Sequence, residues 1–337
     1  MQFRIDNPER IDSEAIVRQH RTGDEIIVQF SNPCYSEKLL RQINELCERF
    51  TSNFQVRFYG HYQGAFDCGN LRFLPAVRSL AVDCLQAVEN HRSLTELPDL
   101  DELSLGVYLL DDPQILGGEN FKNLKELTIS ETKKRNIDLS HLADYRLLRS
   151  LFVGGQTKGI DAIAQLTALD ELRLGQIGKT VPLGFVNKMA NLGSLKLILG
   201  GRANIDEIQH GQLKTLSVVR VQGFESFNSS ALPGLQDLHI EDQIRIPDLK
   251  FSADNKNLTK IVIVNCKGLM RVSGLPSLIN LNQLRISGTG LNIEEILASG
   301  LPPQLKTFAF YTGKSSLNKA IRDRLDELGY KELERAA

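Results

Sequence analysis

The sequence predicts an α/β solenoid of parallel strands with one strand in each repeat, and three observations predict it. First, a central apolar residue recurs at spacings of 21 to 24 residues. Second, another apolar residue follows each one two positions later, as in a strand with one buried face. Third, each period holds only one such strand, which amphipathic helices or a β-sandwich would not explain. The central residues are Leu80, Leu103, Leu127, Leu151, Leu172, Leu195, Leu216, Leu238, Ile261, Leu284 and Phe308.

One stretch shows the repeat unit in full. Residues 258–266 read L-x-x-L-x-L-x-x-C when isoleucine is counted with leucine. With its sister units over residues 70–313, this stretch resembles the leucine-rich repeat family. The resemblance implies a right-handed, curved solenoid with parallel strands on its concave face and turns, 3₁₀ segments or short helices on its convex face. Without an evident appendage, the chain is similar to stand-alone bacterial members.

Residues 1–70 are predicted to form an N-terminal cap that continues into the solenoid. A strand over 25–30 is followed by a helix over 37–50, which Ser36 caps, and by a strand over 54–58. A separate small βαβ domain is the alternative for this strand-helix-strand unit. Residues 1–23 are expected to form either a cap strand or a frayed end.

Residues 71–313 are predicted to hold the repeats, and residues 314–337 a C-terminal capping helix. A parallel stack needs such a cap because its last strand is otherwise a free edge over an open core. A serine at 315 or 316 is expected to cap the helix, and Gly329 suits the position after its end. The expected apolar face is Leu317, Ile321, Leu325 and Leu328.

The turns depart from the family pattern. The family places a buried asparagine after each strand, where its side chain bonds neighbouring backbone in a ladder, and this chain mostly lacks it. We expect the turns to satisfy their backbone groups by other means. The equivalent positions are Tyr108, Thr132, Gln156, Ile177, Gly200, Val221, Gln243, Cys266 and Thr289.

Composition argues against several partners and compartments. The net charge is −1 with 24 % charged residues, so no overall field attracts nucleic acid or a membrane surface. The N-terminus reads as polar, without a signal peptide, and no apolar run is long enough for a membrane span. Five cysteines, an odd number without a C-x-x-C pair, favour a reduced, cytoplasmic setting.

No motif predicts catalysis, a metal or a cofactor. The G-K-S at 313–315 lacks the earlier glycine of a phosphate-binding loop, because Phe308 stands there. Asp237, His239 and Glu241 alternate on one predicted strand and are the only candidates for a weak metal or acid–base site. We expect no catalytic residue, no bound metal and no cofactor, so the chain is predicted not to be an enzyme.

The expected binding surface is the concave face. Its earlier part leans acidic, and its later part carries basic residues together with apolar side chains that face water, as protein-binding sites do. The residues predicted to contact a partner are Glu126, Phe152, Glu171, Arg173, Lys196, Ile198, Val219, Asp237, His239, Glu241, Lys260, Val262, Val264, Arg285 and Tyr311.

These observations predict a non-enzymatic scaffold that binds a protein or peptide on this face. The alternative is a substrate-recognition or toxin-neutralising subunit of a larger assembly, by analogy with the family. An enzyme with a site near His239 is the third hypothesis. Metal bound at this histidine would favour the enzyme.

Overall fold

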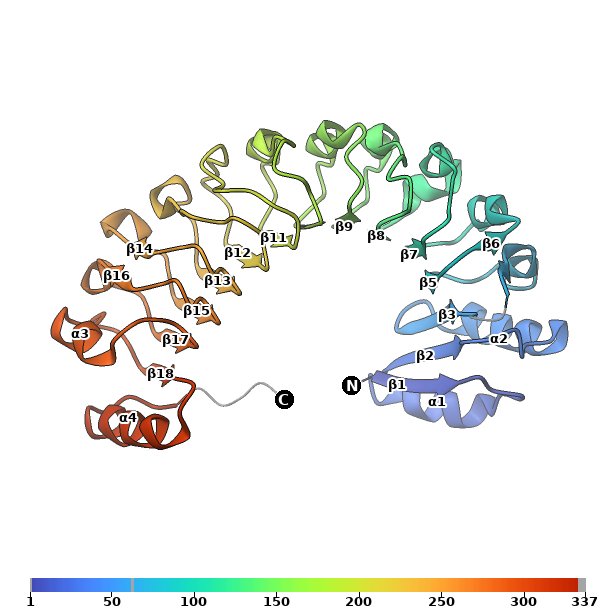
Figure 1. Ribbon diagram of the computed structural model, residues 1–337. Helices are drawn as coiled ribbons and strands as arrows, with labels where there is room; N and C mark the ends of the chain where they lie inside the picture. Colours follow the sequence, from blue (N-terminus) through green and yellow to red (C-terminus); the bar gives the residue numbers. More distant parts are fainter. Residues whose placement is uncertain (1, 62–63, 333–337) are drawn as a thin grey trace. The chain divides into compact units, whose positions relative to one another are not determined.

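The computed structural model, drawn in Figure 1, describes residues 2–61 and 64–332. The chain divides into two compact units between Leu169 and Asp170. In each unit the strands of the main sheet pair in parallel and follow the order of the sequence. Among the described residues, no helix has the length and apolar character needed to cross a membrane. The predicted boundaries 1–70, 71–313 and 314–337 remain predictions; residue 1, residues 62–63 and residues 333–337 within them lie outside the described part.

The first unit combines seven strands of the main sheet with two helices. The strands are β1 (Gln2–Asp6), β2 (Glu25–Phe30), β3 (Phe54–Gly60), β5 (Ser79–Leu85), β7 (Glu102–Val107), β8 (Glu126–Ile129) and β9 (Ser150–Gly154). The helices are α1 (Ser13–Arg21) and α2 (Glu37–Arg49). Two short strands, β4 (Phe66–Asp67) and β6 (Val88–Glu89), pair with each other away from the main sheet.

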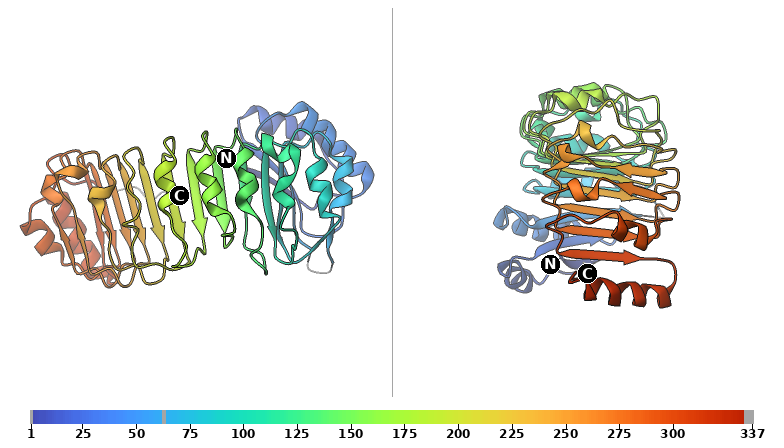
Figure 2. Two further views of the ribbon diagram at one scale, coloured as in Figure 1. Left: turned by 90° about the horizontal axis from the view of Figure 1, so that it is seen from above. Right: turned by 90° about the vertical axis from the view of Figure 1, so that its left-hand side faces the viewer.

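The second unit also contributes seven strands, which Figure 2 shows side by side in colours from green to red. They are β10 (Glu171–Gly175), β11 (Ser194–Ile198), β12 (Thr215–Val219), β13 (Asp237–Glu241), β15 (Lys260–Val264), β17 (Gln283–Ser287) and β18 (Thr307–Tyr311). A second small sheet pairs β14 (Asp248–Lys250) with β16 (Arg271–Ser273). The helices are α3 (Ile293–Ala298) and α4 (Ser315–Glu327).

The predicted repeat register is confirmed. Every predicted central residue is at most 2 % exposed, and every apolar residue two positions later is at most 4 % exposed. Neighbouring central residues are also paired across the strands, as in Leu216 with Leu238 and Leu238 with Ile261. The apolar alternation therefore fixes both which face of each strand is buried and how adjacent strands align.

The N-terminal region contains more elements than the sequence indicated. The strand-helix-strand unit is present, and the Ser36 side chain accepts a hydrogen bond from the Leu39 amide, as an N-cap should. Before it, β1 pairs with β2, and α1 buries Ile16 and Val17. The strand option for residues 1–23 is therefore correct, but the helix over 13–21 was not predicted. β3 pairs directly with β5, so the cap strands belong to the same sheet as the repeats.

The C-terminal helix is present, but half of its predicted apolar face is exposed. Ile321 and Leu325 are buried, whereas Leu317 and Leu328 are each 45 % exposed. The expected serine cap is wrong: Lys314 occupies the N-cap position and makes no side-chain capping bond. Asn318 instead reaches back, accepting from the Thr312 amide at 2.6 Å and donating to the Thr312 carbonyl at 3.2 Å. The prediction for Gly329 is confirmed, since it follows the helix with φ +87°.

A left-handed residue follows each strand of the main sheet in the second unit, except β18. Its backbone amide donates to the carbonyl of the last residue in the next strand, at 2.8 to 3.0 Å. Only one of these residues is a glycine, and their φ values lie between 53° and 63°. Because a left-handed conformation costs a non-glycine residue about 1–2 kcal/mol, the bond to the neighbouring repeat must hold it. The residues are Gln176, Leu199, Arg220, Asp242, Asn265 and Gly288.

Candidate binding face

Every residue predicted for the binding face lies on a strand of the main sheet. Glu126 and Phe152 belong to the first unit, and the others belong to the second. Glu126 and Lys260 are exposed, and the remaining side chains are half-buried. Such partial burial is expected on an open sheet face, because side chains on adjacent strands shield one another. Their role in binding remains a prediction.

In the second unit, strand pairing aligns the outward side chains in three rows. The first row is Glu171, Ser194, Thr215, Asp237, Lys260, Gln283 and Thr307. The middle row is Arg173, Lys196, Ser217, His239, Val262, Arg285 and Ala309. The last row is Gly175, Ile198, Val219, Glu241, Val264, Ser287 and Tyr311. Basic residues therefore gather in the middle row, and aliphatic residues in the last.

The carboxylates of this face have partners within the chain. Glu171 lies 3.7 Å from the Arg173 guanidinium, and Glu241 lies 3.2 Å from Nε2 of His239. Asp237 accepts a long hydrogen bond, 3.5 Å, from the Thr259 hydroxyl. Each of these three carboxylates therefore has a polar contact with a side chain of the second unit.

Three cations differ from these carboxylates. Lys196, Lys260 and Arg285, which we call the basic trio, form no ion pair or hydrogen bond within residues 2–61 and 64–332. The Nε atom of Arg285 is buried and lacks an acceptor there. Its guanidinium carbon lies 6.0 Å from the centre of the Tyr311 ring, at the outer limit of a cation–π contact. The trio thus leaves positive charge available on this face.

The first unit carries a polar chain that the sequence did not reveal. It crosses the strands β1, β2, β3 and β5: Gln29 donates to Asp6, Arg57 donates to Gln29 at 3.3 Å, and the Arg57 Nε donates to Asp83 at 2.8 Å. The guanidinium also lies 4.6 Å from the centre of the Tyr59 ring. Arg57 neutralises Asp83, so the acidic lean expected for the earlier part of the face is weaker than predicted. The period-2 pattern of β3 could have placed Arg57 on this face.

Comparison with known proteins identifies the fold. No protein-family model and no curated protein matches the sequence. Among solved structures, an internalin from Listeria monocytogenes superimposes with a TM-score of 0.57 over 92 % of this chain and 86 % of its own, at 18 % identity. The parallel one-strand repeats decide the class. This chain has the leucine-rich repeat fold.

A second solved structure with this fold is a longer chain. A chain of the Toll–Spatzle complex from Drosophila matches with a TM-score of 0.57 and 13 % identity. The match covers 95 % of this chain but only 48 % of the other chain. At such identities the likeness shows the fold alone.

In this chain, other polar residues replace part of the expected asparagine ladder. Thr132 and Gln156 are buried, and the Gln156 amide donates to the Thr132 hydroxyl at 3.1 Å. The hydroxyl accepts from the Arg135 amide, and the Gln156 carbonyl accepts from the Ile137 amide. The backbone amides of Arg135 and Ile137 are thus satisfied by a threonine–glutamine pair instead of asparagine.

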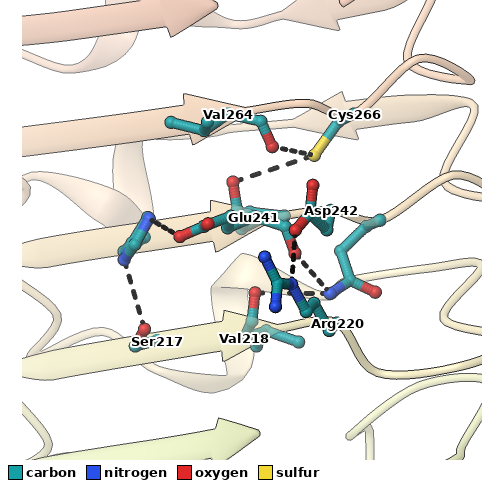
Figure 3. A network of polar contacts seen from close by, with 10 residues as sticks. Ser217, Val218, Arg220, Glu241, Asp242, Val264 and Cys266 are labelled. Carbon is teal, nitrogen blue, oxygen red and sulfur yellow. Dashed lines mark hydrogen bonds and ion pairs between the residues drawn. The ribbon is translucent and has the colours of Figure 1, made fainter. Parts of the chain in front are cut away.

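In the second unit, Gln243 and Cys266 serve the same purpose. The Gln243 amide donates to the carbonyls of Glu241 at 2.8 Å and Val218 at 3.4 Å. The Cys266 thiol donates to the carbonyls of Val264 at 3.4 Å and Ile240 at 3.7 Å (Figure 3). Burial raises the pKa of this thiol to about 11, so it stays protonated as a donor. Cys266 is therefore a structural residue under the face.

His239 stands at the centre of the face. Its Nδ1 lies 3.3 Å from the Ser217 hydroxyl, and its Nε2 faces Glu241. Burial lowers the pKa of this histidine; Glu241 opposes the shift, and the basic trio reinforces it. Among the described residues, no group of three or more His, Cys, Asp or Glu side chains is placed to hold a metal ion.

The lowered pKa of His239 predicts a pH-dependent stability. Between its folded pKa and the unfolded value of about 6.5, the unfolded chain binds the proton more readily, so stability falls as pH falls through this window. We expect His239→Gln to reduce the loss of thermal stability between pH 7.5 and 5. Melting temperatures of both proteins at the two pH values test this. Burial also lowers the pKa of His61, but this residue is the same in the wild type and the variant. An equal drop in melting temperature between the two pH values for both proteins would therefore contradict the assignment to His239.

Proposed function

We propose that this chain is a non-enzymatic interaction scaffold that binds a protein or peptide on the outward face of its sheet. The observation that carries the proposal is the arrangement of the second unit. The aliphatic side chains of Ile198, Val219, Val262 and Val264 remain half-exposed on its aligned strands. They lie on the same face as the basic trio, which has no ion-pair or hydrogen-bond partner in the described part of the chain. Apolar side chains rimmed by charge are the usual anatomy of a protein-binding site.

The dimensions of this face support a macromolecular ligand. Seven strands about 4.8 Å apart give the second unit a face on the order of 29 Å long. A metabolite would instead require a concave pocket that encloses most of its surface. The fold supports an interaction scaffold in general, and the Toll–Spatzle structure, which shares this fold, is a complex.

The proposal includes a reducing compartment such as the cytoplasm. All five cysteines are free thiols, and Cys47, Cys68 and Cys266 are buried. Free buried cysteines are usual where thiols are kept reduced. Neither a nucleic acid nor a membrane is proposed as the ligand.

A capture experiment with two matched double variants tests the face. Lys260→Glu with Val262→Asp changes the face itself. Lys267→Glu with Ile244→Asp makes the same chemical changes at exposed positions in the turns, where Ile244 is 67 % exposed. We expect proteins captured by the wild type to be retained by the turn variant and lost from the face variant.

Thermal melting of both variants separates a loss of binding from a loss of folding. A face variant that keeps its melting temperature and loses its partner would support the proposal. Capture of the same partner by a folded face variant would show that this surface is not the one used.

A further inference from the structure

The charges of the second-unit face do not balance locally. Glu171 and Glu241 each lie against a basic side chain on their own strand, and Asp237 is held by Thr259. Lys260 is directly opposite Asp237 in the strand register, yet the two form no ion pair within the described residues. No carboxylate forms an ion pair with the basic trio within the described residues, so these three cations outnumber the two carboxylates, Asp237 and Glu241, that have no cationic partner near neutral pH.

Arg285 also lacks a hydrogen-bond partner in the described part of the chain. None of its nitrogens has an acceptor in the described part of the chain, and its Nε is buried from water. Leaving a buried donor of a charged group unsatisfied is costly. A carboxylate that approached the guanidinium edge would supply charge-assisted hydrogen bonds, commonly two in parallel.

The spacing of the trio fits an extended chain. Lys196 and Arg285 share the middle row and are four strand steps apart, about 19 Å. Lys260 lies on β15, next to the β17 strand of Arg285. Between the two ends, Val219, Val262 and Val264 offer apolar surface. An extended segment needs about six residues to cover this distance, since each adds at most about 3.3–3.6 Å.

We propose that the basic trio binds an extended acidic segment of a protein partner. One carboxylate would lie over Lys196 and another over the Lys260–Arg285 end, with aliphatic side chains of the segment against the valines between them. This inference rests on the proposed function, that the sheet face binds a protein, and it assigns the chemistry of the ligand.

The other anionic macromolecule, a nucleic acid, fits this face less well. Glu171, Asp237 and Glu241 lie in the rows that flank the basic residues. A phosphate backbone carries a negative charge at every nucleotide and would meet these carboxylates. A peptide can place its carboxylates over the trio alone and present neutral side chains elsewhere.

Fluorescence anisotropy with defined probes tests the proposal on the full chain. The probe is a fluorescein-labelled peptide of about twelve residues, which exceeds the required span, with two glutamates about six residues apart and two valines between them on the same face of the extended chain. The comparison probe has glutamine in place of each glutamate. We expect the acidic peptide to bind at low salt, and the neutral peptide to bind at least about tenfold more weakly.

Two triple variants assign the effect to the trio. Lys196→Gln, Lys260→Gln and Arg285→Gln together are expected to weaken the acidic peptide by about tenfold or more. The control, Lys188→Gln, Lys256→Gln and Lys267→Gln, removes three exposed positive charges away from the strands and is expected to leave binding unchanged. Circular dichroism of both variants establishes that they are folded.

Several results would overturn the inference. One is that the acidic peptide does not bind, and another is that the neutral peptide binds as tightly as the acidic one. Two more are that the control variant weakens binding as much as the trio variant does, and that single-stranded DNA binds the trio more tightly than the acidic peptide does. If the protein partner lost from the face variant still binds the trio variant at wild-type strength, the acidic-segment inference fails while the proposed function stands.

Discussion

Replacing Gly274 by alanine is expected to destabilise the second unit by about 3–5 kcal/mol, whereas the same change at Gly223 costs only about 1 kcal/mol. Both glycines have left-handed backbones, with φ +80° and +78°. A Cβ at 274 would lie 1.9 Å from the Phe251 carbonyl oxygen, but a Cβ at 223 would meet nothing within 4 Å. The difference between the variants therefore measures the close approach of two repeats.

The contact at Gly274 cannot be relieved by a side-chain movement, because the atom it meets belongs to the backbone. The Phe251 amide donates to the Ser273 carbonyl at 3.0 Å, just beyond the pairing of β14 with β16. Room for a methyl group would require these neighbouring segments to separate. Urea unfolding of both variants tests the prediction, and similar losses at the two sites would show that the backbone conformation alone accounts for the cost.

The second large effect is expected at the C-terminal cap. Leu325 in α4 is 3 % exposed and packs on the β18 side of the helix, whereas Leu328, one turn later, is 45 % exposed. Leu325→Asp would bury a carboxyl group in an apolar contact, and we expect a loss of about 3 kcal/mol or more. Leu328→Asp is the matched control and is expected to stay within about 0.5 kcal/mol of the wild type.

Loss of this cap should also expose the edge of the sheet. Beyond α4, the chain returns to β18, where the Phe308 amide donates to the Lys331 carbonyl at 3.1 Å. Without the helix in place, the backbone groups of β18 become available to other strands. We therefore expect Leu325→Asp to form oligomers in light scattering while Leu328→Asp remains like the wild type. A monomeric, equally stable Leu325→Asp protein would contradict this account of the cap.

The repeat core could be predicted from sequence because a single pattern determines it. An apolar residue at each central position, and another two residues later, leaves few ways to bury the strands, and a slip of one residue would expose them. Helix α1 carried no comparable signal: only Ile16 and Val17 are buried in its nine residues. Its clearest sequence mark is Asp12, whose side chain accepts from the Ala15 amide as an N-cap.

The candidate face was predictable in outline but not in its electrostatics. Period-2 alternation places Lys196, His239 and Arg285 on the outward side. Which charges are neutralised depends on cross-strand alignment and on side-chain conformations that sequence spacing does not specify. Arg57, for example, reaches Asp83 across paired strands whose register shifts at a bulge.

The left-handed residues after the strands imply that the turns of the second unit acquire their hydrogen bonds in order, from the N-terminal to the C-terminal end. Each one donates its amide to a carbonyl that belongs to the following repeat, so Asn265 relies on Ser287 and Gly288 relies on Tyr311. During synthesis, a turn would therefore wait for about one further repeat to leave the ribosome. At about 5–20 residues per second, that delay is on the order of one to five seconds per repeat. A nascent chain would carry one unfinished turn at its growing end until β18 and its cap emerge.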